Sequence, residues 1–345
     1  MPPPIDTLID TLLDFDRDAE INRITSKIRE LMRLHLKRRG LVVAMSGGID
    51  SSVCAALAVR ALGPDKVFGL LMPERDSSSD SSIKGRLLAE HLGIRHTVED
   101  IAPALEAIGC YRWRDEAIRT VFPAYGEGWK NKIVIAGGTQ GQINHFKLVV
   151  QEPGNGPLHE QRLGLREYLQ IVAATNFKQR IRKTLEFFHA DRLNYAVVGT
   201  PNRVEYDQGF FVKNGDGSAD IKPIAHLYKT QVYALARHMG LPEVICSATP
   251  TTDTYSLSQG QDEFYYALPY KEMDVALWHL NQGLPAAKLA ECLGVSEEQA
   301  GFIYRDIEAK RRTTAPLHWS PLLVEPVQGP LTQHTREASS PRLRR

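Results

Sequence analysis

The spacing of hydrophobic and polar residues predicts alternating helices and buried strands over the first hundred residues. Apolar side chains recur every three or four positions over residues 21–38, as on one face of an amphipathic helix. The run 41–45 that follows is apolar throughout, which is typical of a strand buried on both faces. The same patterns recur as a helix, a strand and a helix at residues 51–62, 67–72 and 82–92. This alternation predicts an α/β fold whose parallel sheet is covered by helices on both faces.

The alternation lapses between residues 110 and 166. Two apolar runs in this stretch, 133–136 and 146–150, flank a glycine-rich segment. We expect an inserted β-hairpin or flap there, because two strand-forming runs separated by a turn-forming segment tend to pair.

The core pattern resumes after this insertion. A helix is predicted over residues 165–188, and a further buried strand over 195–200. Beyond Gly240 we expect a mostly helical chain, with short helices at 286–293 and 296–310.

The length of 345 residues exceeds the usual size of one domain, but an α/β core with an insertion and a tail fits one. We therefore expect one domain over residues 21–325, with the insertion at about 110–166, after an N-terminal lead of residues 1–20. Residues 326–345 are rich in proline, serine and arginine and are expected to form a disordered tail.

Charge and cysteine content narrow the class of protein. The 42 basic and 41 acidic side chains give a net charge of +1, which offers no electrostatic basis for binding nucleic acid or a membrane surface. The four cysteines form no CxxC pair, so neither a zinc site nor a disulfide framework is indicated. The N-terminus lacks the pattern of a secretory signal, and no apolar run approaches the ~20 residues that cross a bilayer. We expect a cytoplasmic protein that acts on a small molecule.

The residues with the most specific chemistry occupy positions 46–52 and read Ser-Gly-Gly-Ile-Asp-Ser-Ser. They follow the first predicted strand, and open α/β sheets bind ligands at the carboxyl ends of their strands. The glycines let the backbone approach a phosphate, while amides at the helix start and the serine hydroxyls can donate hydrogen bonds. The lysine of the GxxxxGK[ST] loop is missing, so we expect a different bond of ATP to break.

This segment resembles the PP-loop of the ATP pyrophosphatases, which cleave ATP between the α- and β-phosphates to leave AMP and pyrophosphate. The resemblance implies that Asp50 holds Mg²⁺ on the phosphates. It also implies that the phosphate groups are bound by Ser46, Gly47, Gly48, Ser51 and Ser52.

Two later segments, 199–205 and 209–220, resemble the GTxxxxE and GFFxKxGDGxAD motifs of NAD synthetase. The similarity to this family covers roughly residues 20–312 and implies a Rossmann-like parallel sheet flanked by helices, of the adenine nucleotide alpha hydrolase-like type. The implied activity is a carbon–nitrogen ligase reaction in which ATP adenylates deamido-NAD, releasing pyrophosphate, and ammonia then displaces AMP. Glu205 lies just beyond a strand end, so it can share with Asp50 the oxygen coordination that magnesium prefers.

The resemblance implies further roles, position by position. Lys229 matches a lysine that contacts ATP, where its charge would stabilise the leaving pyrophosphate, and Thr200 and Thr251 match ATP-binding positions. Asp216 matches a position near the ammonia pocket, so the implied catalytic residues are Asp50, Asp216 and Lys229. The positions that match deamido-NAD contacts are Arg180, Phe210, Lys213, Asp220 and Lys310.

The sequence departs from the family pattern on the deamido-NAD side, at Pro201, Ser218 and Ala309 and in the insertion. Because of these differences, an alternative function is that of a paralogous adenylating amide ligase that acts on another carboxylate. A non-catalytic nucleotide-binding regulatory protein is a further alternative. Only about 40 residues precede the PP-loop, too few for a glutaminase domain, so ammonia is expected either free or from a separate partner. By analogy with the family, we expect a homodimer.

Overall fold

The core of the protein is a four-stranded parallel sheet with the strand order β3-β2-β1-β7. The computed structural model describes residues 4–136, 145–250, 254–260, 265–266, 268–325 and 327. In the register of the sheet, Val43 of the central strand lies beside Gly69 on one side and Val198 on the other. The strands are β1 (Leu41–Ala44), β2 (Val67–Leu71), β3 (Arg95–Val98) and β7 (Ala196–Val198).

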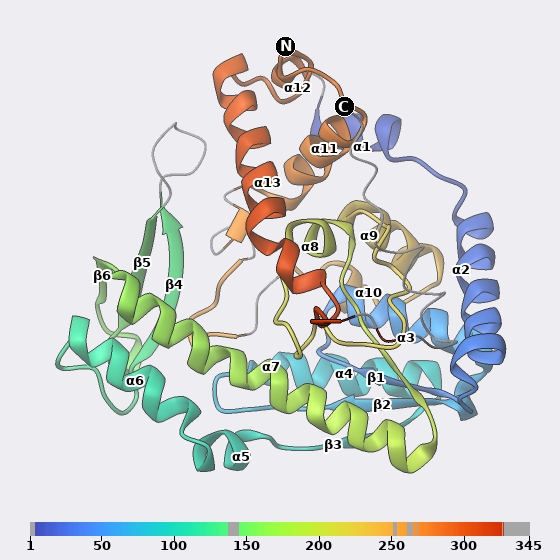
Figure 1. The fold of residues 1–345 in the computed structure, drawn as a ribbon, viewed down its shortest axis with the longest axis horizontal. Coiled ribbons are helices and arrows are strands. Elements are labelled where there is room, and N and C mark those ends of the chain that lie inside the picture. The colour runs from blue at the N-terminus through green and yellow to red at the C-terminus, as the bar shows by residue number, and fades with distance from the viewer. Residues whose placement is uncertain are drawn as a thin grey trace.

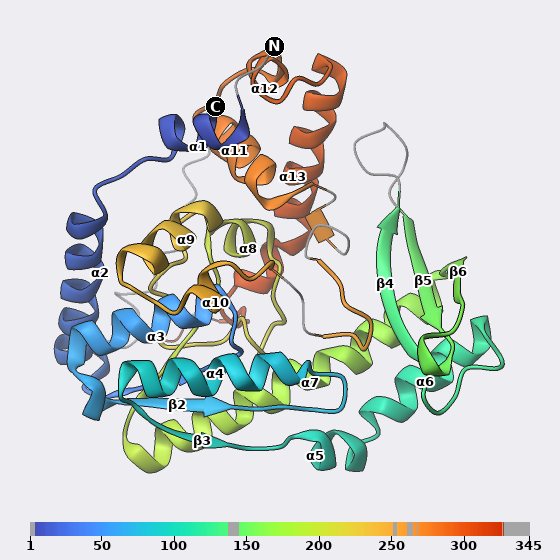
Figure 2. The same ribbon diagram turned by 180° about the vertical axis from the view of Figure 1, so that it is seen from behind.

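Helices cover both faces of this sheet, as Figures 1 and 2 show from opposite sides. Leu41 and Val43 join the hydrophobic core under α3, whereas Val42, between them, joins the core under α7. This division follows from the alternation of side chains along a strand, so an unbroken apolar run is needed to fill both cores. One face carries α2 (Arg17–Leu31), α3 (Ile49–Leu62), α4 (Ser79–Leu92) and α9 (Lys229–His238), and the other carries α5 (Ala102–Ala107) and α7 (Leu165–Leu193).

The α/β core predicted from the sequence is confirmed, with small shifts of the boundaries. The first predicted helix is α2, which continues into a π-helical turn at Met32–Leu36. The strand β3 was not predicted, because Arg95, His96 and Thr97 interrupt any apolar run, and only an edge position accommodates such polar side chains.

The predicted insertion holds a helix and a second sheet, beside the N-terminal half of α7 (Figure 1). Its hairpin is present as the antiparallel pair β4 (Lys130–Ala136) and β5 (His145–Gln151). The helix α6 (Cys110–Val121) and the third strand β6 (Leu158–Arg162) were not predicted. All five residues of β6 are exposed, so this strand lacks the hydrophobic alternation by which a strand is recognised.

The edge of β4 that does not face β5 is hydrogen-bonded to a segment more than 100 residues later in the chain. The backbone amide of Leu257 donates to the carbonyl of Asn131 at 3.1 Å, and the Asn131 amide donates to the Ser256 hydroxyl at 2.8 Å. The side-chain amide of Gln259 donates to the Ile133 carbonyl. The insertion is therefore joined to the segment 254–260, which follows α9 and α10 (Glu243–Cys246) in the sequence.

A helical layer with its own hydrophobic core is formed by α8 (Arg203–Gln208) and by the helices that follow residue 269. These are α11 (Tyr270–Asn281), α12 (Ala286–Leu293) and α13 (Glu297–His318). The helix α1 (Ile5–Leu12), from the predicted N-terminal lead, packs on α11 through Leu8. Short 3₁₀ turns occur at Pro64–Lys66 and Pro153–Asn155.

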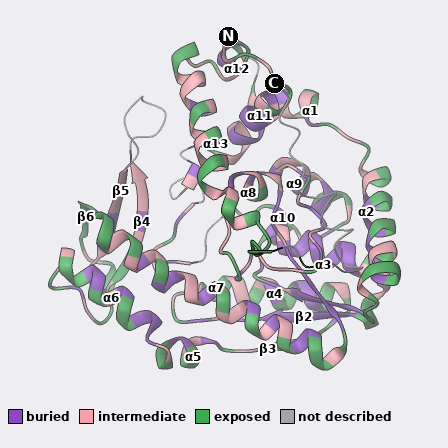
Figure 3. Ribbon diagram, viewed as in Figure 1, coloured by how far each residue is buried: buried purple, intermediate pink, exposed green. Residues whose placement is uncertain are grey.

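Burial follows this division into layers. In Figure 3 the buried residues concentrate on the strands and on the helix faces that cover them. Among the described residues, no helix has the length and apolar character needed to cross a membrane. The predicted tail 326–345 lies outside the described residues except for Val327.

Candidate functional site

Most of the predicted functional residues line one cavity of about 580 Å³. It opens at the carboxyl ends of the parallel strands, since its wall includes Ala44 of β1, Leu71 of β2 and Val198 of β7. The predicted residues in this wall are Ser46, Gly47, Gly48, Asp50, Ser51, Arg180, Thr200, Glu205, Phe210, Lys213, Asp216 and Lys229.

The loop from β1 to α3 has the geometry of an anion-binding turn. Gly47 has φ +75°, and a Cβ atom there would lie 2.6 Å from the Ser81 carbonyl oxygen, so only glycine fits. The hydroxyls of Ser51 and Ser52 donate to the Gly48 carbonyl at 3.0 and 2.8 Å and fix the loop at the N-terminus of α3. The positive end of the helix dipole is thereby directed at the loop, where a phosphate would be stabilised.

Lys229 links two carboxylates beside this loop. Its ammonium donates to Asp50 Oδ2 and lies 3.9 Å from Glu205 Oε1. Burial alone would lower the pKa of Lys229, but the charges of Asp50 and Glu205 outweigh it and hold the pKa above its ordinary value. The side chain is therefore a permanent cation in this cavity.

Asn202 fixes the two carboxylates relative to each other. Its side-chain amide donates to Asp50 Oδ1 at 3.1 Å, and its backbone amide donates to Glu205 Oε2 at 3.2 Å as part of a capping box at the start of α8. Each carboxylate thus has one oxygen engaged by Asn202 and the other facing Lys229.

These carboxylates fit a magnesium ion that is shared with phosphate groups. Mg²⁺ prefers oxygen ligands, and proteins usually supply one or two carboxylates while water and substrate phosphates complete the coordination. The donor set of Asp50 and Glu205 meets this requirement. Among the described residues no group of three or more His, Cys, Asp or Glu side chains is arranged to hold a metal ion.

Asp274 was not predicted as a site residue, but it fixes the backbone at Lys229. Its two carboxylate oxygens accept the backbone amides of Lys229 and Thr230 at 3.2 and 2.7 Å, at the N-terminus of α9. Burial raises the pKa of Asp274 to about 7, although these amide hydrogen bonds oppose the rise. Neither its position in the middle of α11 nor its neighbours in the sequence indicated this contact.

The opposite wall of the cavity is formed by α7 and by the loop 209–217. Arg180 Nε donates to the Lys213 carbonyl at 3.3 Å, and the Lys213 ammonium donates to the Pro316 carbonyl at 2.8 Å. Phe210 stacks on Tyr265 with ring centroids 4.7 Å apart. Arg180 and Lys213 bond only to carbonyl oxygens in these contacts, so their positive charges are available to an anionic ligand.

Three ionisable groups lie in the same wall, of which Lys183 and Glu186 are buried and Asp216 is half-buried. The Lys183 ammonium lies 2.7 Å from Glu186 Oε2, and Asp216 Oδ1 accepts the Val212 amide at 2.7 Å. Burial raises the pKa of both the Glu186 and the Asp216 carboxyl. Helical spacing could have identified part of this wall from sequence, since residues 176, 179, 180 and 183 share one face of a helix.

The remaining predicted residues lie away from the cavity wall or outside the described residues. Ser52 is buried beneath the loop, Asp220 accepts the Val197 amide at 2.7 Å on β7, and the Lys310 ammonium lies 5.0 Å from the centre of the Tyr265 ring. Lys310 also pairs with Asp306 at 2.5 Å. Thr251 lies outside the described residues.

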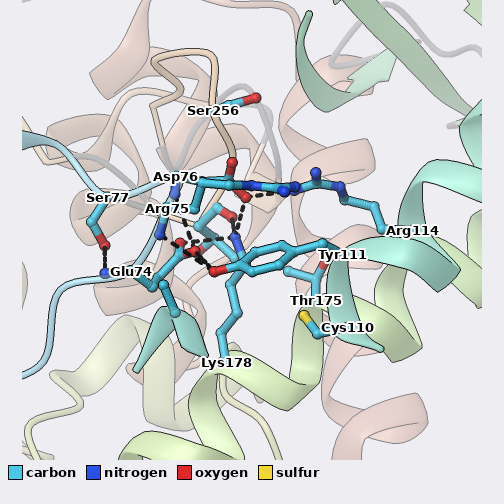
Figure 4. Close-up of polar contacts among 12 residues, drawn as sticks. Glu74, Arg75, Asp76, Ser77, Cys110, Tyr111, Arg114, Thr175, Lys178 and Ser256 are labelled. Carbon is cyan, nitrogen blue, oxygen red and sulfur yellow. Dashed lines mark hydrogen bonds and ion pairs between the residues drawn. The ribbon is translucent and has the colours of Figure 1, made fainter. Parts of the chain in front are cut away.

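A buried ionic network next to the cavity was also not predicted (Figure 4). The Lys178 side chain, which is 1% exposed, rises from α7 and donates to Glu74 Oε1 at 2.9 Å and Asp76 Oδ2 at 2.7 Å. Arg114 of α6 reaches the same Asp76 oxygen at 2.5 Å, and the Tyr111 hydroxyl donates to Glu74 at 2.8 Å.

This network fixes loops that border the cavity. Glu74 and Asp76 belong to the loop between β2 and α4, whose neighbouring residues Pro73 and Ser77 line the cavity. The Lys178 ammonium also donates to the carbonyl of Thr254, another lining residue, at 2.8 Å. In the sequence Lys178 resembles one more basic residue of a solvated helix face, and it is buried only by segments distant in the sequence, which supply Glu74, Asp76 and Thr254.

The chain is similar to known proteins over most of its length. The family model described as NAD synthase matches residues 20–120 and 157–313, which leaves out 121–156 within the insertion. The NH(3)-dependent NAD(+) synthetase of Mesorhizobium japonicum is 55% identical over 313 residues, which are 90% of this chain and 98% of that protein.

Two solved structures share the fold at lower identity. The NH3-dependent NAD synthetase from Campylobacter jejuni has a TM-score of 0.59 at 21% identity, covering 90% of this chain and 100% of that one. The NMN synthetase from Francisella tularensis has a TM-score of 0.58 at 23% identity, covering 91% of this chain and 99% of that one. At these identities the likeness establishes the architecture alone.

We expect Lys178→Met to lower the free energy of unfolding by about 3–5 kcal/mol, because it leaves the buried carboxylates of Glu74 and Asp76 without their cation. Denaturant unfolding measures the change. Lys288→Met, which removes an exposed lysine paired with Glu291, is the control and should have little effect. A buried-site variant as stable as the control would contradict the role of this network.

Asp274→Asn tests the raised pKa of Asp274 through the pH dependence of stability. The folded chain keeps this proton up to about pH 7, whereas the unfolded chain releases it near 3.8, the ordinary pKa of an aspartic acid side chain. This contribution therefore favours folding at low pH and is lost as the pH rises toward 7. The variant lacks this proton, so its free energy of unfolding minus that of the wild type should rise between about pH 3.8 and pH 7. The total rise should be at most about 4 kcal/mol, and the difference should stay constant above pH 7. A difference independent of pH would contradict the raised pKa.

Proposed function

Because the chain belongs to the NAD synthase family, we propose that it forms NAD by the ATP-dependent amidation of deamido-NAD, with ammonia as the nitrogen donor. The main support for the proposal is that groups suited to bind phosphate and groups suited to bind a second anionic substrate line the same cavity. The phosphate loop with Asp50, Glu205 and Lys229 forms one wall, and Arg180, Phe210 and Lys213 form the other. A nucleotide and a second anionic substrate can therefore be held next to each other.

In the first step of the proposed reaction, a carboxylate oxygen of deamido-NAD attacks the α-phosphorus of ATP. The bond to the bridging oxygen breaks, and pyrophosphate leaves with its electron pair. The loop 46–48 and Lys229 bind the leaving group and stabilise the charge that develops on it. Magnesium, held on the phosphates by Asp50 and Glu205, would add further charge neutralisation.

In the second step, ammonia attacks the carbonyl carbon of the acyl-adenylate, and AMP leaves. Ammonia is mostly protonated at neutral pH, so the site must accept a proton before or during the attack. Asp216 lines the cavity, and burial raises its pKa, so this carboxyl is suited to exchange a proton with ammonium. Most of the rate would come from orientation and charge stabilisation, because no protein nucleophile is needed.

A second candidate is the same chemistry on a different carboxylate. It is favoured by Phe146, which β5 of the insertion contributes to the cavity wall, where it stacks on Tyr168 with ring centroids 4.2 Å apart. Phe146 lies in the segment 121–156, which the family model does not match. A non-catalytic nucleotide-binding role has less support, because Asp50, Glu205 and Lys229 all line the cavity.

We also propose that the protein works as a homodimer in the cytoplasm. Three large apolar side chains of α7, Leu165, Leu169 and Phe188, are 74%, 54% and 56% exposed. Burial of such residues against a second chain would be favourable, since it would remove apolar surface from water.

The test of the function is formation of NAD and AMP from deamido-NAD, ATP, magnesium and ammonium, with pyrophosphate measured in the same samples. We expect NAD, AMP and pyrophosphate in equal amounts. A parallel sample with glutamine in place of ammonium should give no NAD, and NAD formed there would indicate another source of ammonia. If folded protein released pyrophosphate only with a different carboxylate, the second candidate would replace the first.

Asp50→Asn should abolish turnover without unfolding the protein. The amide keeps the shape of the side chain but loses the charge that faces Lys229 and that would bind magnesium. Turnover is measured by AMP release, and folding by thermal unfolding. Normal activity in this variant would rule out the metal-binding role of Asp50.

A further inference from the structure

Six cationic side chains line the cavity, and five of them have hydrogen-bond or ion-pair partners. Lys229 pairs with Asp50, Lys183 with Glu186, and Arg182 donates to the Met72 carbonyl at 3.3 Å. Arg180 and Lys213 donate to backbone carbonyls. The sixth is Lys84 of α4, which has neither a hydrogen bond nor an ion pair within the described part of the chain.

Lys84 lies directly beside the phosphate loop. A Cβ atom built on Gly47 would lie 2.9 Å from Lys84 Cβ and 2.6 Å from the carbonyl oxygen of Ser81, one helical turn earlier. No side chain can stand between the loop and α4, so the aliphatic stem of Lys84 starts against the glycine. Its ammonium is then within reach of an anion that the loop binds.

The side chains next to the phosphate loop carry a net negative charge, which disfavours binding of an anion unless another cation is present. Asp50 and Glu205 together carry two negative charges, and Lys229, which lies between them, compensates only one. A polyphosphate bound there would be repelled by the remaining negative charge unless further cations were present. Magnesium would supply part of this charge, and Lys84 is the unpaired protein cation next to the loop within the described residues.

The start of α4 adds donors around the same point. Ser81 and Ser82, in its first turn, line the cavity together with Ser77 of the preceding loop. The N-termini of α3 and α4 thus both border the phosphate loop, and each presents the positive end of a helix dipole. Lys84 follows Ser81 by three residues, so the two share one face of α4.

We propose that Lys84 binds the β- and γ-phosphate oxygens of ATP and holds the pyrophosphate leaving group. This role rests on the proposed function, in which the loop binds the phosphates that leave. Lys84 makes no covalent bond and takes up no proton; it acts as a positive charge and a hydrogen-bond donor. It is placed on the pyrophosphate side, so it should not affect binding of AMP.

Three variants separate a charge effect from a packing effect. Lys84→Met keeps most of the length of the stem and removes the charge, and Lys84→Arg restores the charge. The matched control is Arg86→Met, since Arg86 is an exposed cation on the same helix and does not line the cavity.

The measurement is steady-state NAD formation with ATP varied, together with product inhibition by pyrophosphate and by AMP. For Lys84→Met we expect KM for ATP and the inhibition constant of pyrophosphate to rise about 10- to 100-fold, the usual effect of losing a charge-assisted hydrogen bond. The inhibition constant of AMP and KM for deamido-NAD should change less than about threefold. Lys84→Arg should recover most of the loss, and Arg86→Met should behave as the wild type.

An unchanged inhibition constant of pyrophosphate in Lys84→Met would overturn the proposal. So would an equal weakening of AMP and pyrophosphate, because Lys84 would then act on the nucleoside side or on the fold. If the wild type itself formed no pyrophosphate, the proposed function would fail first, and that result is distinct from a wild-type reaction with an unaffected variant.

Discussion

The placement of Lys229 between Asp50 and Glu205 is the interaction on which the rest of the site depends. The buried Lys229 ammonium is stable because carboxylates compensate its lost hydration, and the two partly buried carboxylates are in turn stabilised by its charge. The three side chains come from α3, α8 and α9, so this cluster fixes the relative positions of elements far apart in the sequence. Asp274 adds a fourth element, α11, by holding the backbone at Lys229.

The parallel sheet places this cluster where a nucleotide can reach it. The strands β1 and β7 are adjacent and point the same way, so the loops that follow them meet at one edge. One loop brings the glycines and serines that bind an anion, and the other brings Asn202 and Glu205. The same edge continues to β2, whose following loop is fixed by Lys178 through Glu74 and Asp76.

The insertion reinforces the site from the side. Its helix α6 supplies Arg114 and Tyr111 to the buried network, and its strand β4 pairs with the segment 254–260. The segment 254–260 is thus held next to the cavity wall, to which Thr254 and Tyr255 belong. The segment 121–156, which the family model does not match, therefore supports the matched part of the chain through β4, and its Phe146 lines the cavity.

By itself the sequence determined the α/β core, the position of the phosphate loop and a minority of the residues that line the cavity, because these depend on local periodicity and on short contiguous motifs. It also indicated the hairpin β4–β5 through two apolar runs. Only the tertiary structure decided the surroundings of Lys178, Asp274 and Lys84. The role of each depends on which side chains from distant segments surround it, and charge, burial and partners at such positions are not encoded in the neighbouring sequence.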